Sequence, residues 1–156
     1  MSDFRWEFRP VAAAPTVTAG AYSANDVLGG LMEFQIPWEP GAGFVDSVRV
    51  VDDADQKAAM TLWLFNAAPT AILDNAAFAP TVADLKKVVG KIAIAASDYT
   101  TLNGNAVALK ALNSDGQTSF YCPNGILYAY AVPSATPTYA AVTDIQIELR
   151  MYRYRG

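Results

Sequence analysis

The segment MTLWLFNAAPTAILDNAAFAP at residues 60–80 gives the clearest indication of how this chain folds. Residues 60–65 are apolar or β-branched at every position, which is typical of a strand covered on both faces in the middle of a sheet. The remainder contains four turn-forming residues: Pro69, Asp74, Asn75 and Pro80. Such residues interrupt both strands and long helices. We therefore expect a central strand, followed by a long connection that crosses from one part of the fold to another.

Residues 144–154 give the clearest period-two alternation in the chain, which is typical of a half-buried strand. The alternating residues are Ile145, Ile147, Leu149 and Met151 on one face and Gln146, Glu148, Arg150 and Tyr152 on the other. Other strand patterns occur at residues 16–22, 27–36, 44–52, 88–95, 106–112, 118–122 and 126–132. The last two are separated by a turn at residues 123–125, so we expect them to pair.

Helix signals are short, since only residues 81–87 predict one or two helical turns, with Thr81 as the N-cap and Asp84 three residues later. About seven to nine short strands without alternating helices predict a single-domain, all-β sandwich. The long crossing after residue 65 favours a jelly-roll or Greek-key topology over a simple meander. The expected core residues are Phe34, Ile36, Val48, Val50, Leu62, Leu64, Leu127, Ile145, Ile147 and Leu149.

We expect residues 1–15 to form a separate N-terminal segment, followed by the sandwich domain of residues 16–156. Their alternating residues are Phe4, Trp6 and Phe8 against Arg5, Glu7 and Arg9, and a linker-like run rich in Ala and Pro follows. Two interpretations stay open. The segment is either an arm that adds to a sheet edge or lies on a neighbouring subunit, or an edge strand of the protein's own sheet.

The composition points to contacts with other subunits. The chain of 156 residues is 53% hydrophobic and 12% aromatic but only 17% charged, against roughly 25% charged residues in an average soluble domain. Interface cores are depleted in charge and enriched in aromatic residues. We therefore predict a homo-oligomer, with a trimer as the expected state. The formal net charge of −4 argues against a nucleic-acid partner, because such proteins carry a basic stripe.

Catalytic and metal chemistry find little support in the sequence. The chain has no histidine, which removes the commonest general base and metal ligand near neutral pH. Cys122 is the single cysteine, so it forms no internal disulfide and is expected to be buried. The run at residues 52–55 has three aspartates but lacks the glycine and glutamate of an EF-hand, which favours a solvated turn over a calcium site. Gly29 and Gly30 lack phosphate-loop spacing and predict a bulge.

The sequence predicts neither a secretory signal nor a membrane span. The N-terminus lacks the basic start and apolar run of a secretory signal. No stretch approaches the about 18 to 20 apolar residues of a membrane span. We therefore expect synthesis in the cytoplasm and no membrane partner. We predict no cofactor, no metal and no catalytic residues.

The sequence leaves two functional alternatives open. Glu33 with Glu39, or Asp74 with a partner, could form the carboxylate pair of a glycosidase, although turns use the same residues. Aromatic residues could form a sugar-stacking platform, although burial in a core or an interface is the favoured interpretation. The aromatic residues considered are Trp38, Tyr99, Tyr121 and Tyr139.

Several segments together carry a resemblance to a known group of proteins. They are AYSANDVLGGL at residues 21–31, LWLF at 62–65, PT at 69–70, DNAAF at 74–78, ILY at 126–128 and PTY at 137–139. In these segments the chain resembles virion structural proteins of tailed bacteriophages, of the capsid decoration or cement kind. The resemblance implies a non-enzymatic, jelly-roll-like β-sandwich that binds the major capsid protein on the virion surface, often as a trimer. A carbohydrate- or receptor-binding module of a phage tail is the alternative.

The charge distribution suggests where such a protein would attach. Residues 148–156 hold three arginines against Glu148, a net charge of +2, whereas residues 10–147 carry −6. Arginine and aromatic residues are the usual anchors of interface hot spots. We therefore hypothesise that the two termini form the surface that docks on the capsid or on the adjacent subunit. The residues predicted for it are Arg5, Trp6, Phe8, Arg9, Arg150, Tyr152, Arg153, Tyr154 and Arg155. The competing interpretation is that these arginines only solvate an edge strand.

Overall fold

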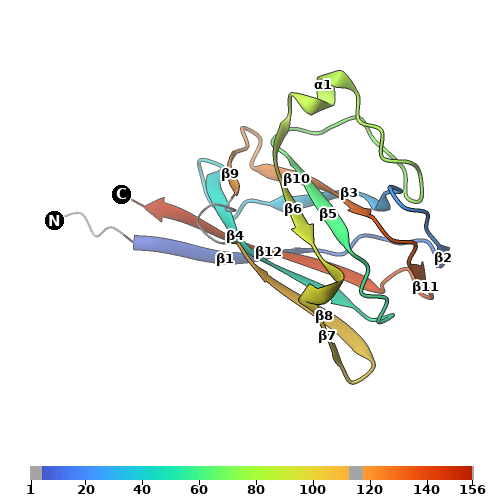
Figure 1. The fold of residues 1–156 in the computed structure, drawn as a ribbon. Coiled ribbons are helices and arrows are strands. Elements are labelled where there is room, and N and C mark those ends of the chain that lie inside the picture. Colours follow the sequence, from blue (N-terminus) through green and yellow to red (C-terminus); the bar gives the residue numbers. More distant parts are fainter. Residues whose placement is uncertain (1–4, 113–117, 156) are drawn as a thin grey trace.

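The computed structural model describes residues 5–112 and 118–155 and consists mainly of two packed antiparallel sheets (Figure 1). The larger sheet contains β1 (Arg5–Ala13), β12 (Ile145–Arg155), β4 (Ala42–Asp52), β8 (Asn105–Ala111) and β7 (Tyr99–Leu102) in this order, and β9 (Thr118–Tyr121) also pairs with β4. The smaller sheet contains β3 (Leu28–Gln35), β10 (Ile126–Pro133), β5 (Met60–Phe65) and β6 (Val88–Ile94). This architecture confirms the predicted all-β sandwich.

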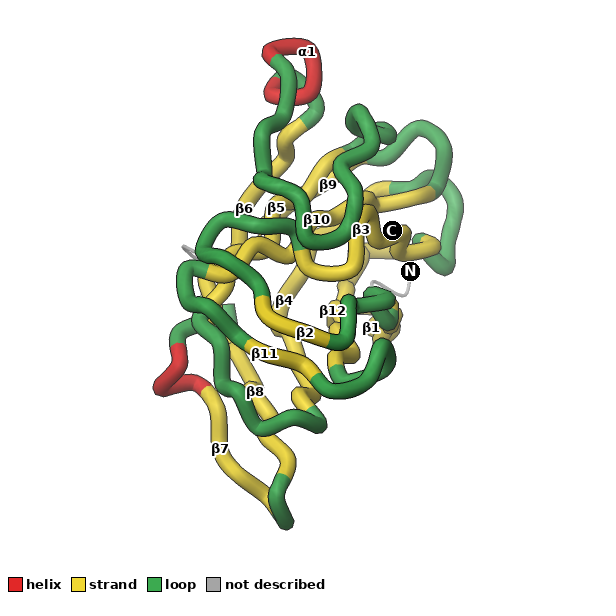
Figure 2. The backbone as a smooth tube through the Cα atoms, turned by 90° about the vertical axis from the view of Figure 1, so that its right-hand side faces the viewer, coloured by secondary structure: helices red, strands yellow, loops and turns green. Residues whose placement is uncertain are grey.

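Eight of the strands are connected as a jelly roll. Counted in chain order, β1, β3, β4, β5, β6, β8, β10 and β12 give the order 1-8-3-6 in the larger sheet and 2-7-4-5 in the smaller one. Consecutive strands therefore repeatedly change sheet, which is the double Greek key of this fold. Two short strands, β2 (Gly20–Ala21) and β11 (Thr138–Tyr139), pair with each other outside both sheets (Figure 2). The strand predicted at residues 16–22 is thus much shorter than expected.

The main core lies between the two sheets. All ten residues predicted for the core are buried in one hydrophobic cluster, and β12 contributes Ile145, Ile147, Leu149 and Met151 with no exposed area. β5 lies inside its sheet between β10 and β6, as predicted. Its residues Met60, Leu62 and Leu64 enter the main core, while Phe65 is buried on the opposite face. The strand is therefore covered on both faces.

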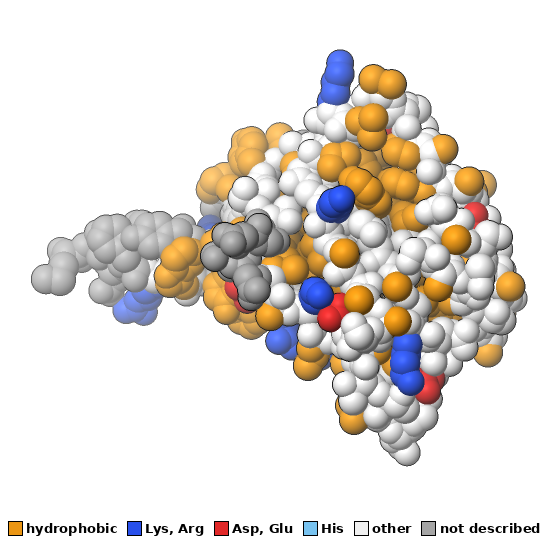
Figure 3. Space-filling view, viewed as in Figure 1, with side chains coloured by type: hydrophobic (Ala, Val, Ile, Leu, Met, Phe, Trp, Pro, Cys, Tyr) orange, Lys and Arg blue, Asp and Glu red, His pale blue; other side chains and the backbone are white. Residues whose placement is uncertain are grey.

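The connection between β5 and α1 (Val82–Leu85) covers the outer face of the smaller sheet. A second hydrophobic cluster forms beneath it around Phe65, Tyr130 and Phe78. The Tyr130 hydroxyl donates to Thr70 O at 3.0 Å and accepts from Ile72 N at 2.9 Å. Hydrophobic side chains of this region gather on the surface below α1 (Figure 3). The predicted crossing connection thus closes one side of the sandwich.

Two aspartates hold this connection in place. Asp74 accepts hydrogen bonds from Gly29 N at 2.6 Å, from the Tyr22 hydroxyl at 2.7 Å and from the Thr18 hydroxyl. Partial burial raises the pKa of the Asp74 carboxyl, but these three donors outweigh it and leave the pKa below its ordinary value.

The second anchor, Asp84, lies in α1 and confirms the predicted helix start. Thr81 and Asp84 form a capping box, because the Thr81 hydroxyl accepts from Asp84 N while the Asp84 carboxylate accepts from Thr81 N. The same carboxylate accepts from Thr70 N at 2.9 Å and pairs with Lys87 Nζ at 3.0 Å. Hydrogen bonds from Thr81 and Thr70 lower its pKa far below the ordinary value.

The predicted pairing of residues 118–122 with residues 126–132 is wrong. β9 pairs with β4 in the larger sheet, whereas β10 lies between β3 and β5 in the smaller one. The intervening turn leads from one sheet to the other and is fixed on both sides, since Cys122 N donates to Gly41 O and Ile36 N donates to Gly125 O. Turn-forming residues are the same for a hairpin and for such a corner. Nearly all of β10 is buried, which requires a neighbouring strand on each side.

The glycine pair of β3 forms the predicted bulge. The register between β10 and β3 shifts between Ala129 and Ala131, opposite Gly29 and Gly30, whose φ angles are +73° and +76°. A Cβ atom on Gly29 would lie 2.3 Å from Cβ of Pro15. Glycine is therefore required there both by its backbone conformation and by the close approach of another segment.

Three further expectations concern turns. The sequence of residues 97–105 predicts a loop or a hairpin turn, and the structure has the hairpin, since β7 and β8 pair around the turn at Asn103 and Gly104. Asp52 is fully buried rather than solvated, since its carboxylate closes the turn by accepting from Ala54 N and Lys57 N, and burial raises its pKa. The hairpin turn expected at residues 113–116 lies outside the described residues.

Candidate functional site

The two chain ends lie side by side, since β1 and β12 pair over the full length of β1. This pairing settles how residues 5–13 are placed, because they form an edge strand of the larger sheet. Opposite residues in the register include Arg5 and Arg155, Trp6 and Tyr154, Glu7 and Arg153, Phe8 and Tyr152, Arg9 and Met151, and Pro10 and Arg150. All nine residues predicted for the docking surface therefore lie in this pair of strands, which we call the terminal ribbon.

An aromatic patch, defined as Trp6, Phe8, Phe44 and Tyr152, lies on the outer face of the terminal ribbon and of the adjoining strand β4. Phe8 contacts Tyr152 with ring centroids 5.0 Å apart, Phe44 stacks on Tyr152 at 5.8 Å, and Trp6 meets Phe44 edge-on at 5.6 Å. Trp6 and Phe8 are 61% and 40% exposed. A shallow hollow of about 320 Å³ lies among Trp6, Phe44, Asp46 and Tyr152. Large aromatic residues exposed together in this way mark interaction surfaces.

The docking hypothesis put Arg153 on the docking surface, but in the structure its side chain contacts other residues of the protein. Its guanidinium pairs with Glu7 at 2.6 Å, donates to Glu39 O at 3.0 Å and lies 5.2 Å from the ring centroid of Trp38. Arg9 pairs with the same Glu7 at 3.2 Å. These contacts join the terminal ribbon to the loop after β3. Arg153 therefore holds the ribbon in position, and only 18% of its side chain is exposed.

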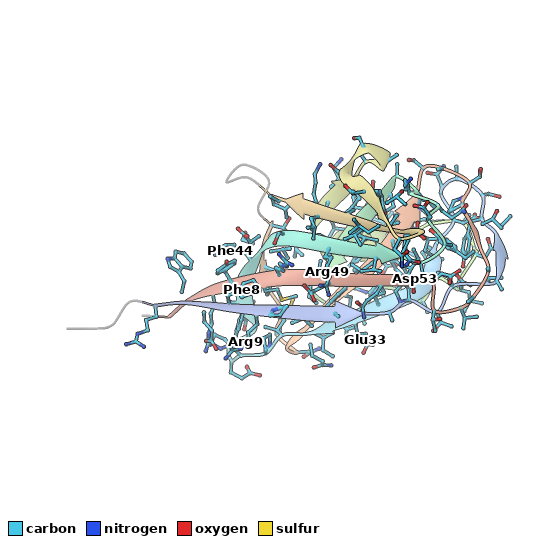
Figure 4. The ribbon with its side chains drawn as sticks, turned by 90° about the horizontal axis from the view of Figure 1, so that it is seen from below. Phe8, Arg9, Glu33, Phe44, Arg49 and Asp53 are labelled. Carbon is cyan, nitrogen blue, oxygen red and sulfur yellow. The ribbon has the colours of Figure 1, made fainter. Side chains whose placement is uncertain are left out.

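Arg49 and Arg150 lie together on the outer face of the larger sheet, next to the aromatic patch. Arg49 Nη2 donates to Glu148 Oε2 at 2.7 Å, and Arg150 Nε donates to the other carboxylate oxygen at 3.3 Å. Arg49 and Glu148 are cross-strand neighbours of β4 and β12. Figure 4 shows Arg49 on the same side of the sheet as Phe8 and Phe44. Sequence reasoning missed Arg49, because only the strand register reveals which carboxylate it faces.

The two sheets differ in what covers their outer faces. The connection between β5 and α1 packs on the smaller sheet. Among residues 5–112 and 118–155, no comparable segment packs on the larger sheet, whose outer side chains include exposed apolar residues at both edges. These are Trp6 and Phe8 on β1, Leu109 on β8 and Leu102 on β7. The larger sheet thus offers a broad, partly apolar face.

The residues considered for catalysis and sugar stacking are dispersed. Trp38, Tyr99 and Tyr139 are buried, whereas Tyr121 is exposed on β9. Glu33 is exposed on β3, and Asp74 is occupied by the hydrogen bonds described above. No group of three or more side chains suited to hold a metal ion occurs within the described part of the chain. Burial raises the pKa of the Cys122 thiol to about 11, which makes it a poor nucleophile near neutral pH.

Comparison with known proteins adds a fold-level likeness. No protein-family model matches the chain, and no curated protein matches it. Among solved structures, a chain from the structure of tomato aspermy virus, determined by X-ray crystallography, is similar with 8% sequence identity and a TM-score of 0.38. The match covers 100% of this chain and 79% of that chain. At this level the likeness carries no argument about function.

None of the helices in the described residues is both long enough and apolar enough to cross a bilayer.

Proposed function

We propose that this protein is a non-enzymatic virion structural protein that binds the capsid shell as a decoration or cement protein. The observation that carries the proposal is the aromatic patch on the outer face of the larger sheet, a face on which no other segment of the described residues packs. A monomeric protein rarely exposes clustered aromatic side chains without a partner. The proposed partner is the major capsid protein, and the proposed location is the capsid surface, after synthesis in the host cytoplasm.

The fold and the sequence resemblance support this proposal. Jelly rolls are among the folds that build virus capsids, but the same fold also occurs in lectins and other proteins, so the fold alone assigns no activity. The segments that carry the resemblance to phage decoration proteins include residues 74–78 and 126–128. In this structure, residues 74–78 belong to the connection that closes the smaller sheet. They therefore support the scaffold, and the docking surface is proposed from the geometry of the larger sheet.

We also propose that the protein acts as a homo-oligomer, with a trimer as the expected state. The support is the low charged fraction of 17% together with Leu102 and Leu109, apolar residues exposed at the edge of the larger sheet opposite the terminal ribbon. A ring is closed when one patch of each subunit contacts a different patch of the next subunit. Sedimentation equilibrium should give three times the chain mass, either free in solution or on the capsid. A monomer in both states contradicts this proposal.

Binding to assembled capsids tests the proposed decoration function. Purified protein is mixed with assembled capsids that lack it and is then pelleted, with bovine serum albumin as a control for trapping. We expect saturable co-sedimentation, with a fixed number of copies per capsid. Absence of the protein from the pellet at saturating concentration contradicts the proposal.

A carbohydrate- or receptor-binding module of a phage tail is the second candidate. The hollow among Trp6, Phe44, Asp46 and Tyr152 favours it, because exposed aromatic rings beside a carboxylate suit the apolar face and hydroxyl groups of a sugar ring. A glycan array separates the candidates. Glycan binding that Trp6→Ala abolishes, together with absence from capsid pellets, would replace the first proposal with the second.

A further inference from the structure

The outer face of the larger sheet has an imbalance of charge at its centre. Arg49 and Arg150 flank Glu148, and each guanidinium donates to one of its two carboxylate oxygens. Two cations and one anion leave a charge of +1 on this group of three residues, while the carboxylate of Asp46 lies in the neighbouring hollow with Tyr152. The Glu148 side chain is 13% exposed, whereas those of Arg49 and Arg150 are 35% and 37% exposed. The carboxylate therefore lies deeper, and the two cations are the groups that a partner would meet.

Both arginines keep hydrogen-bonding capacity that the described residues do not use. A guanidinium has five N–H donors and binds a carboxylate best through two parallel bonds. Each of these arginines instead shares Glu148 with the other. The donors open to a partner are the other guanidinium N–H groups, because Arg49 Nε is buried and has no acceptor within the described residues. Such orphaned donors are rare in folded proteins.

We propose that Arg49 and Arg150 form a binding site for an Asp or Glu carboxylate of the partner protein, with apolar partner residues covering the adjacent aromatic patch. The proposal deepens the function given above, since it names the chemistry of the contact. A second carboxylate would balance the charge of the site and fill the free donors. Arg150 lies two residues from Tyr152 on the same face of β12. One acidic residue next to apolar ones could thus engage both surfaces.

The proposed site differs from the hypothesis that the arginines near the termini dock together on acidic residues. Arg9 and Arg153 are paired with Glu7, so they contribute to the ribbon itself. Arg49, which is far from the termini in sequence, takes their place in the docking surface. The acidic partner residue is therefore expected above the middle of β4 and β12, beside the aromatic patch.

The first test needs no capsid. The side-chain Nε–Hε resonances of Arg49 and Arg150 are assigned by NMR through the variants Arg49→Gln and Arg150→Gln and are then followed during titration with sodium acetate at constant ionic strength. We expect saturable shifts with acetate, no shifts with acetamide, and weaker shifts of the remaining arginine in each variant. Equal responses to acetate and acetamide, or none to either, overturn the site whether or not the protein binds capsids.

The second test uses capsids and a matched control. The variant Arg49→Gln/Arg150→Gln leaves Glu148 without its cations and should lose stability, but at a temperature where circular dichroism shows it to be folded it should bind capsids at least about tenfold more weakly. Its binding should also depend less on salt. Lys57→Gln/Lys91→Gln loses the same charge away from this face and should bind like the wild type.

The outcomes of the capsid test separate the two proposals. Wild-type affinity of the arginine variant overturns the carboxylate site and leaves the decoration function intact. Equal weakening by both double variants also overturns the site, because net charge would then explain the loss. Absence of wild-type protein from the pellets contradicts the decoration function, and the acetate titration still decides the site.

Discussion

Phe8 lies directly opposite Tyr152 across the terminal ribbon, with ring centroids 5.0 Å apart. The two residues are separated by most of the sequence, yet this contact joins the first and last strands of the jelly roll. Cross-strand aromatic pairs stabilise a sheet by roughly 0.2–1 kcal/mol. Here the pair also builds the aromatic patch, so the same contact serves the fold and the proposed docking surface.

The central position of β5 predicts a large effect of Leu64→Ala. Leu64 is fully buried between the sheets, and truncation of such a residue costs about 2–5 kcal/mol through lost burial and the cavity left behind. Urea denaturation should show this loss. Leu73→Ala is the control, because Leu73 is 76% exposed and its truncation should cost less than about 0.5 kcal/mol. A loss below about 1 kcal/mol for Leu64→Ala would show that the strand is peripheral.

The hydroxyl of Tyr130 is predicted to hold the connection between β5 and α1 on the smaller sheet. Tyr130→Phe removes the bonds to Thr70 O and Ile72 N while keeping the ring contacts. We expect a loss of about 1–3 kcal/mol, because two backbone groups lose their partner. Hydrogen exchange should also become faster at the amide of Ile72. Unchanged exchange at that amide would show that packing alone holds the connection.

The lowered pKa of Asp84 predicts a specific response to acid. A carboxyl group whose pKa is lower in the folded than in the unfolded state stabilises the fold when it is ionised. Its contribution is therefore complete at neutral pH, begins to fall near the unfolded Asp pKa of about 4 and falls further toward the folded-state pKa. Asp84→Asn should flatten this part of the pH profile of the unfolding free energy. Parallel profiles of the variant and the wild type would contradict the role of Asp84.

The sequence predicts those parts of the fold that depend on local patterns. Alternation in residues 144–154 predicts the buried face of β12, and Thr81 with Asp84 predicts the start of α1. Pairings between distant strands are not local. The turn at residues 123–125 therefore suggested a hairpin, although the adjoining strands belong to different sheets.

The docking surface shows the same limit. The aromatic and basic character of the termini is visible in the sequence, but the β1–β12 register decides that Arg153 faces Glu7 and that Phe8 faces Tyr152. Phe44 and Arg49 join the surface only through the pairing of β4 with β12. A strand's alternation shows which residues share a face, but it does not show which strand lies next to it.

Capsid binding by a variant of the aromatic patch is the most direct test of the proposal that this patch docks on the capsid. Trp6→Ala/Phe8→Ala removes two exposed rings while leaving the Glu7–Arg153 pair and the main core in place. Val82→Ala, on exposed α1, is the control. With wild-type circular dichroism and melting temperatures for both variants, we predict at least roughly tenfold weaker co-sedimentation with capsids for Trp6→Ala/Phe8→Ala and unchanged binding for Val82→Ala. Full occupancy of capsids by the folded double variant would contradict the account.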